Sequence, residues 1–228
     1  MKRQHFNTTF FRFLEELAKN NEREWFQRNK DRYEREVRDP LIQFVLDFGK
    51  PLRKISPSFV ADPRPVGGSI FRIHRDTRFS KDKRPYKTHA GVQFRHARAK
   101  DVHTPGFYVH LEPKNVFVGV GIWRPDTAAQ LSIRKAIVED PARWKKILRA
   151  KSFRDRLELS GEQLKGPPRG FDPEDPHIED LKRKDFIAVA KFPQREACAP
   201  GFLAEVAFTF RTASPFVHFL TDALDLEW

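Results

Sequence analysis

The chain has 228 residues, of which 39% are apolar and 32% are charged, a composition that allows one domain with a substantial core. Its single cysteine, Cys198, excludes an intrachain disulfide and a cluster of cysteine metal ligands. The longest apolar runs, such as residues 116–123, are far shorter than the roughly 20 residues of a membrane span, and the N-terminus lacks the apolar region of a secretory signal. We therefore expect a cytoplasmic protein that does not enter the membrane.

The charge is strongly positive and unevenly distributed. Lysine and arginine number 43 against 31 acids, a net charge of +12, and residues 61–110 alone carry 11 cations and four acids. A field of this sign favours an anionic partner, either a phosphate-bearing small molecule or nucleic acid. The simpler alternative is a basic surface whose cations only contact solvent. Nothing in the sequence defines the oligomeric state.

The N-terminal part is predicted to be helical. Apolar residues recur at helical spacing over residues 10–17. Asn21 and Glu24 then have the spacing of a capping box for a second helix over residues 22–49, with a kink or restart at Pro40.

A sheet is predicted to begin at about Ser69, because the apolar period changes from about 3.6 to 2 after a connector rich in proline and glycine. The short links between the segments favour antiparallel pairing. The predicted strands are residues 69–74, 90–97, 106–112 and 115–123.

The remaining residues alternate between helical patterns and breaks. A helical stretch covers residues 127–150, with Asp126 as N-cap and a break near Pro141. Residues 160–176 contain seven prolines and glycines, which predicts a long loop able to fold over a site. Three further elements follow: a short helix at 176–184, a strand at 186–192, and a terminal helical region at 201–226 interrupted near Pro215.

These elements predict one α+β domain in which an antiparallel sheet packs against N-terminal, central and C-terminal helices. Its parts are a helical N-terminal portion (1–50), a sheet portion (69–123) and a mostly helical portion with one further strand (126–228).

Residues 72–89, here called the basic segment, carry the densest chemistry in the chain. Seven cations stand against two acids, Asp76 and Asp82, a local net charge of +5. Such a density is unfavourable unless carboxylates or an anionic ligand neutralise it. We therefore expect the guanidinium groups of Arg75 and Arg78 to lie within hydrogen-bonding reach of an acid or an anion.

The basic segment also carries a resemblance. Its residues Arg72, Arg75, Asp76, Arg78, Phe79, Asp82, Lys83 and Tyr86 resemble the signature of the bacterial and fungal family called domain of unknown function 2461. Further stretches are similar to that family's pattern in the same order: residues 21–26, 106–113, 121–125, and 159–162 through Pro167 and Pro168. The resemblance covers nearly the whole chain. It implies no activity, because the family has none established.

Within the segment, arginine forks bind phosphate or carboxylate bidentately and lysines act as point charges. Asp76 lies between Arg75 and Arg78, where it would orient one guanidinium. Phe79 and Tyr86 are predicted to anchor the segment to the core. The candidate ligand-binding residues are Arg72, Arg75, Arg78, Lys83, Tyr86, Lys87 and His89.

A second cluster lies on the strand at 106–112. There Tyr108, His110 and Glu112 share one face, opposite an apolar face. His110 and Glu112, with Asp76, are candidate proton carriers. Joined by His89 or Asp76, they are also ligand types for a divalent metal, but His-x-Glu on a strand is a weak signal. The default is a set of satisfied polar residues, and we assign no metal.

Three interpretations of function stay open. The first is a module that binds a phosphate-bearing or other anionic ligand through the basic segment. The second is an enzyme that acts on such a ligand with His110, Glu112 or Asp76 as proton carriers. The third is a scaffold in which the segment is an internal salt-bridge network. No dinucleotide, P-loop, nucleophile-elbow or zinc-protease motif occurs, so we expect no cofactor.

Overall fold

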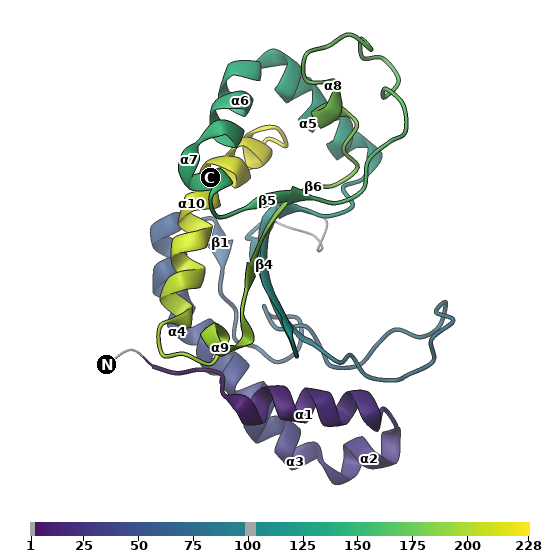
Figure 1. Cartoon of the computed structure of the whole chain (residues 1–228), viewed down its shortest axis with the longest axis vertical. Helices are drawn as coiled ribbons and strands as arrows, with labels where there is room; N and C mark the ends of the chain where they lie inside the picture. The colour runs from purple at the N-terminus through teal and green to yellow at the C-terminus, as the bar shows by residue number, and fades with distance from the viewer. Residues whose placement is uncertain (1–2, 99–103) are drawn as a thin grey trace.

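Antiparallel pairing joins all the strands that the structure contains. The computed structural model describes residues 3–98 and 104–228, and these form an α+β fold around a six-stranded, strongly curved sheet (Figure 1). The strand order is β1-β2-β3-β4-β6-β5, and every neighbouring pair is antiparallel. The strands are β1 (Phe59–Val60), β2 (Ala90–His96), β3 (Gly106–Glu112), β4 (Asn115–Ile122), β5 (Glu158–Ser160) and β6 (Phe186–Phe192).

The alternation predicted for β3 is confirmed and defines the two faces of the sheet. Phe107, Val109 and Leu111 are fully buried, and their face packs against two long helices, α4 (Asp39–Ile55) and α10 (Phe202–Asp222) (Figure 1). Tyr108, His110 and Glu112 point to the opposite face. The apolar half of the strand thus holds the sheet on the core, which leaves the polar half available for a site.

The N-terminal helices follow the predicted order but begin and end differently. They are α1 (Thr8–Lys19), α2 (Arg23–Arg28), α3 (Lys30–Tyr33) and a π-helical turn at Glu34–Arg38 that runs into α4. The capping box expected for α2 is wrong: the N-cap is Glu22, without a side-chain bond. The amide side chain of Asn21 instead bonds the backbone of Tyr86, 65 residues away.

In the C-terminal half, the predicted break near Pro141 is confirmed. It separates α5 (Thr127–Glu139) from α6 (Pro141–Arg149), and Asp126 caps α5 as expected. The interruption expected near Pro215 is wrong, because α10 runs through it. The carbonyl of Arg211, which loses its helical donor at this proline, accepts from the hydroxyl of Ser214 instead (2.9 Å). Short helices α7 (Lys151–Arg154), α8 (Ile178–Leu181) and α9 (Gln194–Ala197) complete this half.

The strand predicted at 69–74 is wrong. These residues make only isolated bridges, Ile70 with Val92 and His74 with Tyr86. The chain follows β2 briefly and then turns away to pair with its own later residues, so it never forms a regular ladder. Two short strands, β1 and β5, were not predicted because two or three residues are too few to show a period. None of the helices in the described ranges combines the length and apolar character needed to cross a membrane.

Aromatic rings fill the contact between the sheet and the two long helices. The ring of Phe48 stacks on Phe94 at 4.7 Å, and the ring of Phe210 lies 4.8 Å from Phe107. All four side chains are fully buried. Each therefore removes a large apolar area from water and interlocks with a ring from another element.

We predict that Phe210→Ala lowers the free energy of unfolding by about 3–5 kcal/mol, because it leaves a cavity at this contact. The matched control is Phe208→Ala on the same helix, whose side chain is 51% exposed and should cost less than about 1 kcal/mol. Urea denaturation followed by circular dichroism measures both values. Equal losses in the two variants would show that this contact is not central to the fold.

Candidate functional site

The basic segment folds back on itself and projects from the body of the protein on the side of the sheet away from α4 and α10 (Figure 1). Two backbone bonds close its base: Arg75 donates to Pro85 (2.9 Å) and Lys87 donates to Ile73 (2.8 Å). Residues 76–84 form the tip. The base and the tip of the segment differ in how their charges are neutralised.

Tyr86 anchors the base to the N-terminal helices. Its ring is only 3% exposed and stacks on Phe26 with a centroid distance of 4.1 Å. The side chain of Asn21 both donates to the carbonyl of Tyr86 and accepts from its amide, each at 3.0 Å. The prediction that Tyr86 anchors the segment is therefore confirmed, and its ring is buried in that contact. Phe79, also predicted as an anchor, is 96% exposed at the tip, so that prediction is wrong.

Ion pairs within the segment neutralise the arginines of the tip. Asp76 accepts two bonds from the guanidinium of Arg78, and this pairing lowers the pKa of Asp76 to about 2. Asp82 pairs with both Arg84 and Arg75. The expectation that Arg75 and Arg78 each meet an acid is thus confirmed, and both acids orient guanidinium groups. Lys83 donates to the carbonyl of Thr77 (3.0 Å).

Among the described residues, the base carries two cations without an ion pair, the half-buried Lys87 and the exposed Arg72, although Asp76 lies close enough to Arg72 for that charge to help lower the pKa of the carboxyl. Within the described part of the chain, neither Lys87 nor Arg72 makes an ion pair or a side-chain hydrogen bond. The ammonium group of Lys87 is half-buried and lies 5.1 Å from the centre of the Phe71 ring. Burial, together with the charge of nearby Arg72, lowers the pKa of Lys87. Partial burial of a cation without a neighbouring acid is energetically unfavourable, and a bound anion would reduce that cost.

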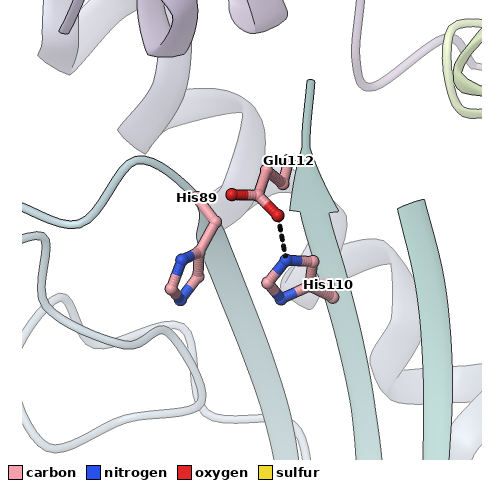
Figure 2. A group of neighbouring side chains, drawn as sticks. All are labelled: His89, His110 and Glu112. Carbon is pink, nitrogen blue, oxygen red and sulfur yellow. Dashed lines mark hydrogen bonds and ion pairs between the residues drawn. The ribbon is translucent and has the colours of Figure 1, made fainter. Parts of the chain in front are cut away.

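His89, directly before β2, comes beside the polar face of β3. Since Ala90 pairs with Leu111 and Gly91 pairs with His110, the register brings His89 level with Glu112. The rings of His89 and His110 lie 4.6 Å apart, and one nitrogen or oxygen atom from each of these three side chains lies within 4.8 Å of the other two. Figure 2 shows the carboxylate of Glu112 beside both imidazoles.

A chain of hydrogen bonds holds this group in place. The hydroxyl of Tyr108 lies 3.0 Å from Nδ1 of His110, and Nε2 of His110 lies 3.3 Å from Oε2 of Glu112. Asn115 also donates to that oxygen (2.7 Å). The ring of His110 stacks on Phe117 at 4.4 Å. These contacts fix the plane of the imidazole and the direction of the carboxylate.

Gly91 makes room for this arrangement. A Cβ atom at position 91 would lie 2.8 Å from the hydroxyl oxygen of Tyr108 and 2.9 Å from the ring of Phe71. Any side chain there would push away the phenol that contacts His110. The glycine therefore allows Tyr108 to lie across β2 and reach the base of the basic segment.

The environment favours neutral imidazoles beside a charged carboxylate. Burial, and then the neighbouring His110, lowers the pKa of His89 to about 4. Burial also lowers the pKa of His110, although its hydrogen bond to Glu112 acts in the opposite direction. Burial alone would raise the pKa of Glu112, but hydrogen bonds from Asn115 and His110 bring it below its ordinary value. Burial raises the pKa of Tyr108, so its phenol stays protonated.

The structure brings some of the predicted site residues together and separates others. His89, His110 and Glu112 form one group, with Lys87 and Arg75 close enough to influence the charge of His89. Asp76, predicted as a proton carrier, is bonded to Arg78 in the exposed tip and is not part of this group. Sequence reasoning missed Asn115, which the tight turn between β3 and β4 brings back to Glu112. The only signal in the sequence was that Glu112 and Asn115 lie three residues apart on either side of a predicted turn.

A hollow of about 430 Å³ opens beside the group. Its walls come from α1, the end of the basic segment and the turn between β3 and β4, and include Ala18, Thr88, Glu112 and Lys114. Glu112 therefore faces both the imidazoles and a space large enough for a small ligand.

The fold and the site define a class of protein: an α+β domain with a cluster of polar side chains on one face of the sheet and a basic segment beside it. The chain belongs to the family described as conserved hypothetical protein (DUF2461), whose model matches residues 9–219. This match confirms the resemblance seen in the sequence. No match was found among curated proteins or among solved structures.

The lowered pKa of His89 predicts a pH dependence. The unfolded chain takes up a proton at His89 near pH 6.5, whereas the folded protein takes it up near pH 4. The unfolded state therefore binds more protons between these values, so stability falls as the pH drops from about 6.5 to 4. The charged and titratable groups that face His89 are His110, Glu112, Lys87 and Arg75.

Titration followed by NMR should give His89 a pKa well below that of a free histidine. The variant His89→Gln should lose part of the fall in melting temperature between pH 6.5 and 4. A His89 pKa near 6.5, or an unchanged acid slope in the variant, would contradict the burial described here.

Proposed function

We propose that the base of the basic segment binds an anionic ligand, and that this ligand carries phosphate. The observation that carries the proposal is the half-buried ammonium group of Lys87, which has no acidic partner in the described part of the chain and lies near Arg72, an exposed cation without an ion pair. Removing a cation from water is costly unless an opposite charge meets it. Where the protein supplies no carboxylate, a bound anion is the simplest source of that charge.

Phosphate suits this setting better than a single carboxylate. Arg72 offers a planar fork for two oxygens, and Lys87 offers a point charge for a third. A phosphate-bearing ligand also brings enough negative charge to meet both cations at once. The rings of Phe71 and Tyr108, whose centroids lie 6.0 Å apart, provide an apolar wall for the part of the ligand that carries the phosphate.

The tip is a weaker candidate for the same role. Its acids already occupy the guanidinium groups of Arg78 and Arg84, and Lys83 is bonded to a backbone carbonyl. For the tip, the internal salt-bridge network is the better interpretation. The ligand-binding residues that we propose are therefore Arg72 and Lys87, with Arg75 and His89 at the border of the site.

A second candidate function is an enzyme that acts on the bound ligand. The hydrogen bond between His110 and Glu112 favours it, because a carboxylate that holds an imidazole in one orientation is the usual arrangement of a general base. In this candidate His110 moves the proton and Glu112 orients it. Asp76 has no part, since it is paired in the tip.

The test is the double variant Arg72→Ala and Lys87→Ala. We expect it to bind inorganic phosphate and a short single-stranded oligonucleotide at least about tenfold more weakly, because each bond to a charged group contributes about 1.5–3 kcal/mol. Isothermal titration calorimetry at physiological salt, with a chelator present, measures both ligands. Binding of phosphate alone indicates a small molecule, and much tighter binding of the oligonucleotide indicates nucleic acid.

The matched control is Lys145→Ala with Lys146→Ala, two exposed lysines on α6. It removes the same charge and should change binding by less than about twofold, apart from the general effect of net charge. Equal losses in the two double variants would show that the attraction is only bulk charge. Unfolding of the first variant would instead favour a structural role for these cations, so its melting temperature is measured alongside.

A further inference from the structure

We infer that His89, His110 and Glu112 bind a divalent transition-metal ion such as Zn²⁺. Two imidazoles and one carboxylate, from β3 and from the loop end before β2, converge here, with one ligand atom of each within 4.8 Å of the other two. This inference goes beyond the proposed function, because it depends on these three side chains and not on Lys87 and Arg72.

The ligand set suits zinc. Catalytic zinc sites use three protein ligands, commonly two histidines and a glutamate, and leave the fourth position open. Bonds of about 2.1 Å in a tetrahedron place ligand atoms about 3.4 Å apart. The three side chains therefore need to close in by roughly an ångström. His89 lies directly before β2, outside the strand ladder, so a shift of its side chain breaks no strand pairing.

The neighbouring contacts fit metal binding in detail. Tyr108 contacts Nδ1 of His110, so Nε2 is the ring nitrogen that faces Glu112 and donates its hydrogen to the carboxylate. When an ion takes the place of that hydrogen, the imidazole changes tautomer and Nδ1–H donates to the phenol oxygen of Tyr108. Asn115 holds Oε2 of Glu112 and leaves the other carboxylate oxygen for the ion. Partners of this kind set the tautomer of a histidine ligand and the direction of a carboxylate ligand. The stack of His110 on Phe117 fixes the plane of the ring.

The described residues contain two other histidine–carboxylate pairs, His5 with Asp47 and His218 with Asp222. His218 and Asp222 on α10 lie 3.3 Å apart, the same separation as His110 and Glu112. That pair is exposed and has no second imidazole beside it. Among the described residues, only His110 and Glu112 have a second histidine close enough to share an ion.

The charges around the group indicate what occupies the open position. Glu112 supplies one negative charge, whereas Lys87 and Arg75 lie near His89. A bare dication beside these cations is repelled. An anion that bridges the ion and Lys87 removes this repulsion, a step that rests on the proposed function.

The experiment titrates chelator-treated protein with Zn²⁺ by calorimetry and with Co²⁺ by visible absorption, which reports the ligands around the ion. We expect one ion per chain. Since the loss of a contact that only orients a ligand costs about 10–100-fold in affinity, His89→Ala, His110→Ala and Glu112→Gln should each weaken binding at least about 100-fold. Tyr108→Phe, which removes only an orienting contact, should weaken Zn²⁺ binding by about 10–100-fold and alter the Co²⁺ spectrum.

The matched control, His218→Ala, should bind Zn²⁺ with unchanged affinity. Melting temperatures identify any variant that does not fold. If His110→Ala is such a variant, His89→Ala and Glu112→Gln carry the test. The inference is overturned if the unchanged protein binds no ion, if His89→Ala binds as tightly as the unchanged protein, or if His218→Ala loses as much affinity as the three site variants. Phosphate binding in chelator is measured separately, so failure here leaves the proposed function standing.

Discussion

The attachment of Tyr86 to the N-terminal helices is the constraint on which the site depends. Asn21 holds the backbone of Tyr86 by two hydrogen bonds, and Phe26 stacks on its ring. With this residue fixed, Lys87 and His89 have only a few bonds of freedom before β2 begins. The anchor therefore determines where an unpaired cation and an imidazole meet the polar face of β3.

This arrangement divides the basic segment into two parts with different chemistry. At the tip, short-range ion pairs such as that of Asp76 with Arg78 neutralise exposed charge, and such pairs contribute little to stability. At the base, Lys87 is half-buried without an acid, which is unfavourable for folding alone. An unfavourable feature retained beside a hydrogen-bonded group such as His110 and Glu112 is typical of a functional site.

The sequence predicted the elements whose signal is local. The alternation along β3 and the proline at the start of α6 were read correctly, because period and backbone restriction act within a few residues. Long-range contacts gave no such signal: Asn21 looked like a helix cap, yet it bonds Tyr86. Tyr108, His110 and Glu112 were grouped from their alternation, but their meeting with His89 required the register of β2 on β3. The exposure of Phe79 also depends on where the segment projects.

The most direct test of the account is a crystal structure of the protein soaked with tungstate, an electron-dense analogue of phosphate. The account predicts an anion within contact distance of the ammonium group of Lys87 and the guanidinium of Arg72, on the side of His89. An anion held only by Arg78 and Arg84 at the tip, or none bound at the base, would contradict it.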